Sequence, residues 1–353
     1  MDADFGFSRG SFDRDSDRRD DTEHLDHLLN DGRTTVYLVC GAELPIIDAY
    51  ALQTFSWDQL RPFAEGGIVV YLGRIIPTSA ALDGSLFTAT SERVIVPTEE
   101  AAPGSVPLIN DSETIAEPAI DVQPPSAFLL ILDSEQRTLL DTLIGPLQWA
   151  MARTLGEGEL SPAEESVAAT AAGLEAWHRH DPFCSHCGTA TVIVSAGWVR
   201  RCPACSTPFF PRVDPAVIMA VIDANDRILL GHNLTWPEGR YSLLAGFVEP
   251  GESAEMAVRR EVAEEAGIEV GAVRFIGSQP WPFPRSLMLT FEADALTTDI
   301  HVDGTEMGDA RWFTRGELAA AVASGEIGLA PRTALAHTVI EQWHGAPLES
   351  ATW

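Results

Sequence analysis

The stretch from Gly246 to Ile268, GFVEPGESAEMAVRREVAEEAGI, contains carboxylates whose spacing suits the binding of a divalent metal ion. Glu261, Glu264 and Glu265 stand at i, i+3 and i+4, so on a helix they project from one face within a single turn. Oxygen ligands clustered in this way suit a hard cation, and Mg²⁺ is usually bound by a few carboxylates together with waters and substrate phosphates. The stretch therefore predicts a carboxylate metal site.

A helix must hold these carboxylates, and the sequence marks both of its ends. Ser253 is a good N-cap residue, and Gly267 suits the left-handed position that follows a helix. Ala257, Val258 and Val262 form an apolar side that would pack against a sheet. We predict a helix between these caps, with its acidic edge fixed by packing.

An exposed acidic helix face is the alternative for an isolated E-x-x-E-E pattern, because charge runs mostly lie on the surface. Here the longer pattern G-x5-E-x7-R-E-V-x-E-E-x-G-I is complete from Gly246 to Ile268, and its nine specified positions are very unlikely to arise by chance. The pattern resembles the signature of the Nudix hydrolases, which cleave nucleoside diphosphates linked to another group. The resemblance implies that Arg260 pairs with Glu252 to orient the cluster and that Glu264 is a ligand or a base. It implies a catalytic set of Glu252, Arg260, Glu261, Glu264 and Glu265, and Mg²⁺ or Mn²⁺ ligands Glu261, Glu265 and Glu306.

Four cysteines form a second metal-binding pattern, with Cys184 and Cys187 separated by fourteen residues from Cys202 and Cys205. Each C-x2-C places two thiolates on one tight turn, and two such turns complete a tetrahedron around Zn²⁺. Disulfides and redox-active pairs are the alternatives; a reducing compartment disfavours the first, and duplication at this spacing disfavours the second. Because cysteines fill all four positions, we predict one structural Zn²⁺ per chain that stabilises the fold.

The stretch from Ser278 to Ser286, SQPWPFPRS, has three prolines at alternate positions. Alternate prolines exclude a helix and favour an extended, rigid loop, while Trp281 and Phe283 offer large flat faces. Such a loop suits a planar ring and its sugars, because a preorganised backbone loses little entropy on binding. A Pro-rich linker is the alternative, which is disfavoured because the stretch lies between two predicted strands of one domain.

Together with the four-Cys ribbon, WHRHDPFCSHCG and LAGFVEPGE, the SQPWPFP stretch resembles the NADH pyrophosphatases among the Nudix hydrolases, over roughly residues 170–345. The resemblance implies hydrolysis of NAD(H) to nicotinamide mononucleotide and AMP, and permits NAD-capped RNA as the substrate. It also implies a homodimer. Other Nudix substrates, such as ADP-ribose or diadenosine polyphosphates, and a zinc-ribbon regulator that binds nucleic acid with a vestigial Nudix fold, are the competing hypotheses.

The same resemblance implies a set of substrate contacts. Phe210 stands where family members often have Tyr, so its ring can stack but the hydroxyl is lost. Gly197 stands where some relatives have an acidic residue, which puts a second polar contact in question. The implied substrate-binding residues are Phe210, Ala245, Phe247, Gln279, Pro280, Trp281, Pro282, Phe283, Pro284, Arg285, Ser286 and Ala336.

Composition limits the remaining possibilities. The 353 residues suffice for two domains or more, and the apolar runs, such as Ala127 to Leu132, are too short to span a membrane. The N-terminus lacks the apolar region of a signal peptide, so we predict a cytoplasmic protein. The net charge of −29 argues against a broad nucleic-acid footprint. The sequence has no lysine, so side-chain cations that contact phosphate must be arginines.

These patterns predict an α+β protein, in which a Nudix α/β/α sandwich follows a four-Cys zinc ribbon and a β-rich N-terminal domain. We expect a disordered acidic tail at 1–30, the N-terminal domain with its closing helices at 31–180, the ribbon at 181–212 and the Nudix domain at 213–345. Predicted strands include 34–40, 68–73, 93–97, 127–133 and the hairpin 217–223 with 227–233, and predicted helical segments lie near 134–156, 162–180, 316–325 and 333–343.

Overall fold

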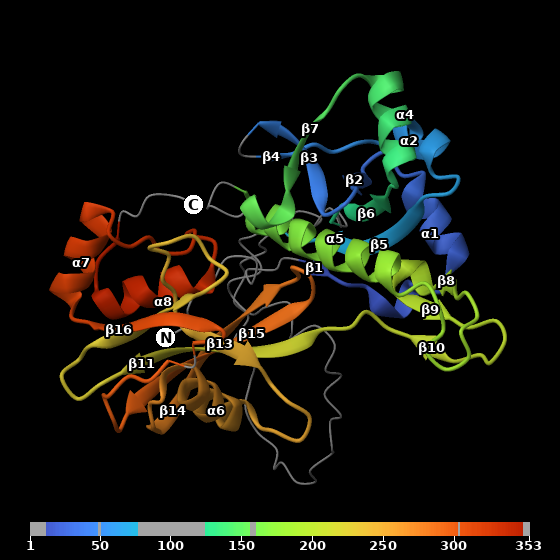
Figure 1. The fold of residues 1–353 in the computed structure, drawn as a ribbon. Helices are drawn as coiled ribbons and strands as arrows, with labels where there is room; N and C mark the ends of the chain where they lie inside the picture. Colours follow the sequence, from blue (N-terminus) through green and yellow to red (C-terminus); the bar gives the residue numbers. More distant parts are fainter. Residues whose placement is uncertain (1–11, 49–50, 77–123, 156–159, 303, 349–353) are drawn as a thin grey trace, which may run out of the picture.

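The computed structural model describes residues 12–48, 51–76, 124–155, 160–302 and 304–348. The predicted strand at 93–97 lies outside these ranges. Helix α5 (Pro162–His180) lies between the N-terminal strands and the C-terminal sheet (Figure 1). The strands of the cysteine-rich segment, β8 (Val192–Val194), β9 (Val199–Arg201) and β10 (Pro208–Phe209), lie beside one of its ends. No helix in the described ranges combines the length and the apolar character that crossing a membrane requires.

The N-terminal domain is built on a four-stranded sheet. Its order is β1 (Phe12–Asp13), β5 (Ile68–Ile75), β6 (Ser126–Ile131) and β2 (Thr35–Val39), with β2 and β6 parallel. Helix α5 covers one face, and α1 (Thr22–Leu29), α2 (Trp57–Leu60) and α4 (Ser134–Ile144) border the core on the other. Both faces are therefore buried, which explains why β2 and β6 are nearly continuous apolar runs.

Residues 12–30 differ from the predicted disordered tail. Phe12–Asp13 pairs with β5, and Asp21 caps α1 by accepting the His24 N–H at 3.0 Å. Leu25 and Leu28 pack against the buried core beneath α1. The segment is too polar to form a core of its own, so its order depends on the sheet that it covers.

The predicted helical segment near 134–156 is correct only in its first half. Helix α4 ends at Ile144, and β7 (Gln148–Met151) pairs with β3 (Glu43–Asp48), which also pairs with β4 (Ala51–Leu52). Gly145, with φ of 97°, and the following Pro146 stop the helix. This Gly-Pro signal was present in the sequence.

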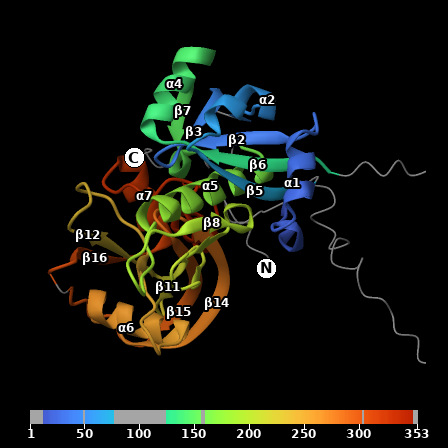
Figure 2. The same ribbon diagram turned by 90° about the vertical axis from the view of Figure 1, so that its right-hand side faces the viewer.

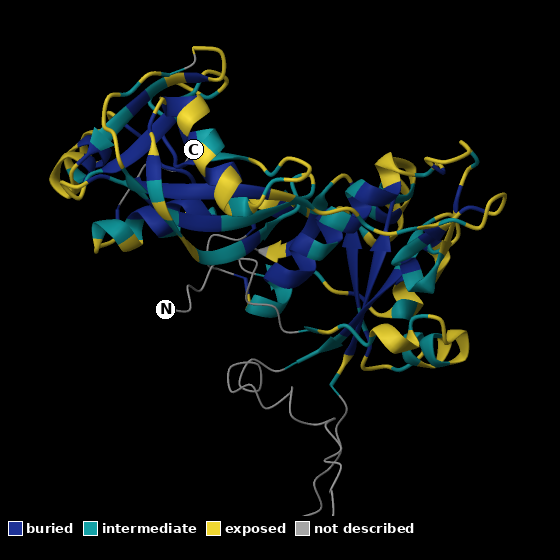
Figure 3. Ribbon diagram, turned by 90° about the horizontal axis from the view of Figure 1, so that it is seen from below, coloured by how far each residue is buried: buried dark blue, intermediate teal, exposed yellow. Residues whose placement is uncertain are grey.

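The C-terminal domain is a sheet between two helical layers, as predicted. The strand order is β14 (Val270–Trp281), β15 (Ser286–Ala295), β11 (Asp214–Ile222), β12 (Ile228–Asn233) and β16 (Met307–Phe313), and β13 (Leu244–Phe247) pairs with β11. Helix α6 (Ala254–Ala266) lies on one side, and α7 (Arg315–Ser324) and α8 (Leu335–His344) lie on the other (Figures 1 and 2). The strands form the buried layer (Figure 3).

The proline-spaced stretch is mostly a strand and not the predicted loop. Residues 278–281 are the end of β14, where Trp281 pairs with Ser286 of β15, so residues 282–285 alone form the turn. Strand β14 lies at the edge of the sheet, where a proline without an N–H is tolerated. The extended backbone was predicted correctly, but its pairing partner was not.

Candidate functional site: an acidic helix and a four-sulfur cluster

The acidic helix α6 begins and ends where the sequence predicts. The Ser253 hydroxyl accepts the Met256 N–H at 3.3 Å, and Gly267 takes a left-handed φ of 67°. Val258 and Val262 are completely buried against the sheet. The direction of the acidic edge is therefore fixed by the apolar side of the same helix.

Arg260 connects the acidic groups around this helix. Its guanidinium donates to both carboxylate oxygens of Glu252, at 3.0 and 2.9 Å, which confirms the predicted pairing. The same group donates to Glu261 at 2.7 Å, to Glu264 at 3.1 Å and to the Phe247 carbonyl at 2.8 Å. Arg260 thus joins the end of β13, the loop before α6 and the helix itself, and it offsets repulsion between the carboxylates.

Glu261 lies over the backbone of Gly246, where any side chain would overlap its carboxylate. Burial raises the pKa of Glu261 above its usual range, the nearby Glu264 and Glu306 add to the rise, and Arg260 opposes it. A carboxyl held in this way gains by binding a cation. Gly246 is needed because it leaves the room that Glu261 occupies.

Glu306 reaches this region from the loop before β16. Its carbonyl accepts the Leu234 N–H at 2.9 Å, and its carboxylate contributes to the electrostatic environment of Glu261. Glu265, on α6, is 7% exposed, whereas the Glu264 side chain is 61% exposed. The all-oxygen donor set of Glu261, Glu265 and Glu306 fits Mg²⁺ or Mn²⁺.

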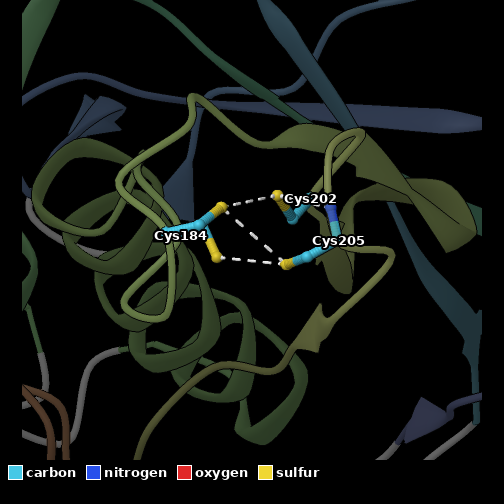
Figure 4. Close-up of side chains that lie close together, drawn as sticks. Cys184, Cys202 and Cys205 are labelled. Atoms are coloured by element: carbon cyan, nitrogen blue, oxygen red, sulfur yellow. Dashed lines mark hydrogen bonds between the residues drawn. The ribbon is translucent and has the colours of Figure 1, made fainter.

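The four cysteine sulfurs converge on one point. The Sγ atoms of Cys184 and Cys205 are 3.7 Å apart, and Cys187 Sγ lies 3.5 Å from Cys202 and 3.9 Å from Cys205. A tetrahedron with Zn–S bonds of about 2.3 Å has edges of about 3.8 Å. No disulfide joins the cysteines, all of which are free, and Figure 4 shows three of the side chains directed toward one another. Among the described residues, these four form the group of ligand atoms that all lie within 4.8 Å of one another.

Two equivalent backbone turns build this cluster. In the first, the Cys184 N–H donates to Thr189 O and the Gly188 N–H donates to Cys184 O, both at 2.8 Å. The second turn repeats the pattern around Cys202, at 3.0 and 2.9 Å. Hydrogen bonding to Thr189 lowers the pKa of Cys187 to about 6, which favours the thiolate that a metal needs. His186 is exposed and is not part of the group of four ligand atoms.

The Gln279 side chain makes two hydrogen bonds to the backbone that the sequence did not predict. Its side chain is 1% exposed, its Nε2 donates to Thr333 O at 2.9 Å, and its Oε1 accepts the Leu335 N–H at 3.0 Å. Leu335 begins α8, and the adjacent Ala336 is buried. Gln279 therefore holds the start of α8 through these two hydrogen bonds.

The two aromatic residues of the substrate segment are partly buried between domains. Trp281 and Phe283 make a T-shaped contact with ring centroids 5.2 Å apart, and both pack against the N-terminal core that includes α5. By contrast, Phe210 and Phe247 are 64% and 60% exposed, and Ala245 is half-buried. The structure therefore does not gather the implied substrate residues into one pocket.

Several substrate-segment residues instead line a cavity of about 560 Å³ that the sequence did not predict. Pro280, Pro282, Arg285 and Ser286 lie on one side, and residues of α5 and the N-terminal segment lie on the other. Pro284 is exposed on the turn. No sequence signal indicated this cavity, because its two sides come from different domains.

Gly197 also has a structural role that the family comparison did not suggest. It has φ of 89°, and a Cβ there would lie 2.6 Å from a methyl carbon of Val70 in β5. The next residue, Trp198, donates its indole N–H to Tyr71 O at 2.7 Å. An acidic residue at Gly197 would be strained and would collide with the sheet, so the glycine serves docking of the ribbon.

Comparisons with known proteins match the two regions of the chain that contain these clusters. Residues 179–210 match the NADH pyrophosphatase zinc ribbon domain, and residues 212–333 match the NUDIX domain. The sequence is 43% identical over 197 residues to human NAD-capped RNA hydrolase NUDT12, covering 52% of this chain and 43% of that protein. It is 43% identical over 194 residues to NAD-capped RNA hydrolase NudC of Mycobacterium bovis, covering 52% and 62%. Nudix hydrolase 19, chloroplastic, of Arabidopsis thaliana is 45% identical over 205 residues, covering 56% and 45%.

The chain thus spans between 43% and 62% of the length of these curated relatives. The ribbon match and the sulfur geometry together identify the four cysteines as a zinc site. The sandwich and the domain match identify residues 212–333 as a Nudix domain.

Proposed function

We propose that this chain, which carries a NUDIX domain behind a NADH pyrophosphatase zinc ribbon domain, hydrolyses the pyrophosphate of NAD(H) to nicotinamide mononucleotide and AMP. The observation that carries the proposal is the acidic helix α6, whose carboxylates are held in place by Arg260. That arrangement concentrates negative charge beside the end of β13, which contains the half-buried Ala245 and the exposed Phe247.

In this proposal, Glu261, Glu265 and Glu306 would hold Mg²⁺ or Mn²⁺. Such ions lower the pKa of a bound water and neutralise charge on a pyrophosphate. Arg260 keeps Glu252 and Glu261 in fixed positions, and Gly246 leaves space for Glu261. Glu264 is mostly exposed, and its ion-pair partner among the described residues is Arg260, so it is able to accept a proton from an approaching water.

The names of two relatives support NAD-capped RNA as a second substrate of the same site. Both substrates share the nicotinamide end and the pyrophosphate, so one arrangement of carboxylates serves both. With RNA, the leaving product would be a 5′-monophosphate chain.

Turnover of NADH, ADP-ribose and NAD-capped RNA, each with and without Mg²⁺ or Mn²⁺, tests the proposal. We expect metal-dependent cleavage, with NADH or the capped RNA preferred over ADP-ribose. Preference for ADP-ribose or diadenosine compounds would assign another Nudix specificity. Nucleic-acid binding without cleavage of any of these compounds would instead favour the zinc-ribbon regulator.

We also propose that the protein is a cytoplasmic homodimer, in line with the family resemblance. For its domains we propose 31–180, 181–212 and 213–345, with residues 12–30 joined to the first because they pack on its sheet. Sedimentation equilibrium tests the dimer, and limited proteolysis followed by mass spectrometry tests the boundaries.

A further inference from the structure

A cleft of about 560 Å³ is lined by residues of α5 and of the turn that joins β14 to β15. None of the carboxylates around α6 lines it, nor do Ala245, Phe247 or Ala336. Its volume is within the range of small-molecule sites, which is roughly 300 to 1,000 Å³. The cleft is therefore a space of nucleotide size apart from the acidic helix.

Arg14 places a guanidinium on one wall of this cleft. It follows β1, which is held by pairing with β5, and it donates to Thr170 Oγ1 of α5 at 3.2 Å. Within the described ranges, no carboxylate lies at ion-pair distance from Arg14. Burial and the neighbouring Arg19 both lower the pKa of Arg14, as expected where a cation lacks an acidic partner.

The opposite wall carries two more arginines. Arg212 and Arg285 share the carboxylate of Asp214, at 2.6 and 3.1 Å, and Arg285 also lies 3.6 Å from Asp181. Three guanidiniums therefore meet two carboxylates around the cleft. In a chain whose net charge is −29, this local excess of positive charge favours an anionic ligand.

The rest of the lining suits a ligand with a flat, largely apolar body. Leu174, Pro280 and Pro282 form apolar walls, and Trp198 lies beside Arg14, whose guanidinium is 5.4 Å from the indole centroid. Thr170 supplies a hydroxyl next to the guanidinium. A phosphate joined to a nucleoside combines the charge and the body that these walls match.

We propose that this cleft binds a ribonucleotide, with Arg14 pairing to its phosphate and the nucleoside packing between Leu174 and the two prolines. The carboxylates of the acidic helix do not line the cleft, but Pro280 and Pro282 belong to the implied substrate residues, so the inference deepens the proposed function and rests on it. The same phosphate chemistry is found in a free mononucleotide and in a nucleotide of an RNA chain. The test below separates these two sources.

Calorimetric titration of the zinc-loaded full-length protein with AMP, in buffer without Mg²⁺ or Mn²⁺, measures the affinity of the cleft for the nucleotide. We expect Arg14→Gln to weaken AMP binding about tenfold or more, because a charge-assisted pair with phosphate is lost. Thr170→Glu, which gives Arg14 an internal carboxylate, should have the same effect without removing the guanidinium. Adenosine should bind more weakly than AMP and respond to neither change.

Arg18→Gln is the matched control, because Arg18 is exposed and lies 3.8 Å from Asp15. It should leave AMP binding unchanged. Affinities for AMP and for a short NAD-capped RNA that are both unchanged in Arg14→Gln and Thr170→Glu would overturn the proposal, as would adenosine binding as tightly as AMP. Inorganic phosphate and a short NAD-capped RNA separate the sources: loss of affinity for phosphate and AMP indicates a free nucleotide, and loss for the RNA alone indicates a chain phosphate.

NADH turnover is measured in parallel, so that failure of the two proposals can be told apart. AMP binding that depends on Arg14 in a protein that does not cleave NADH would overturn the proposed function alone. Cleavage of NADH without any Arg14-dependent binding of AMP or of the RNA would overturn the cleft proposal alone.

Discussion

The two metal-binding regions of this chain are organised in opposite ways. The zinc ribbon brings four sulfurs within 4.8 Å of one another by two backbone turns that repeat the same hydrogen bonds. The acidic region spreads its carboxylates over α6 and the loop before β16, and an arginine holds several of them. A closed set of ligands can only stabilise structure, whereas a spread set leaves coordination positions for water and substrate.

The two regions also differ in how the repulsion between their negatively charged ligands is offset. Zn²⁺ would bond directly to each of the four thiolates and offset part of their mutual repulsion, so the sulfurs can lie at contact distances from one another. Carboxylates of α6 repel each other, and burial already raises the pKa of Glu261. Arg260 offsets part of this repulsion, and a bound cation would offset more of it.

The largest effect is expected at the zinc site. Cys184→Ala removes one of four sulfurs, and structural Zn²⁺ contributes on the order of 10 kcal/mol to folding in small zinc domains. We expect loss of bound zinc and unfolding of the ribbon, measured by metal analysis and thermal melting. Cys40→Ala is the control, because Cys40 is buried outside the cluster and should keep the zinc. Full zinc content and an unchanged melting temperature in Cys184→Ala would contradict the assignment of a closed, structural zinc site to the four cysteines.

The acidic helix should respond in activity and not in folding. Glu265→Gln keeps the shape of a side chain that is 7% exposed while removing its charge, and we expect NADH turnover to fall by about two to three orders of magnitude. Melting temperature should change little. Glu255→Gln makes the same chemical change at an exposed position of α6 and should keep activity. Near-normal turnover in Glu265→Gln would contradict the proposed metal site.

Acid should weaken the contact between α5 and the zinc ribbon. His178 is 4% exposed, accepts a hydrogen bond from Arg200 at Nδ1 (2.9 Å) and donates from Nε2 to Gly197 O (2.9 Å). The contact with Arg200 requires the neutral ring, because a protonated Nδ1 cannot accept a hydrogen bond. Burial lowers the pKa of His178 to about 4. Because the folded pKa lies below the ordinary value near 6.5, stability is complete above that pH and decreases as the pH falls toward 4, by about 3 kcal/mol at most.

Denaturant unfolding between pH 7 and pH 4 measures this loss. His178→Gln should be less stable at pH 7 but should lose less stability on acidification than the unmodified protein. His186→Gln changes an exposed histidine within the first cysteine turn and should keep the original pH dependence. Equal pH dependence in all three proteins would show that His178 does not couple α5 to the ribbon.

The smallest effect is expected at Gln279, which lies in the domain that carries the acidic helix. Gln279→Met leaves Thr333 O and the Leu335 N–H without this side-chain partner, and we expect a loss of about 2 kcal/mol of unfolding free energy. Because α8 starts at Leu335, KM for NADH should rise more than kcat falls. Gln148→Met, at an exposed position of β7, is the control. An unchanged KM together with lower stability would limit Gln279 to folding.

Much of the local structure could be predicted because its causes are local. The caps of α6, the two cysteine turns and the hairpin between β11 and β12 each depend on residues close together in the chain. The ordered segment at 12–30 was not predicted, because its few leucines are buried only against a sheet formed by later residues. Strand β7 was missed although Gly145 and Pro146 mark the break.

The sequence by itself determined the metal chemistry: carboxylates at helical spacing for a hard cation, and paired cysteines for zinc. Only the tertiary structure decided that Gln279 supports α8, that Trp281 and Phe283 pack between domains, and that Arg14 faces a cleft. The physical reason is the separation along the chain of the residues that interact. Capping and ligand spacing act within a few residues, whereas burial and cavities depend on which distant surfaces meet, and a linear pattern does not record that meeting.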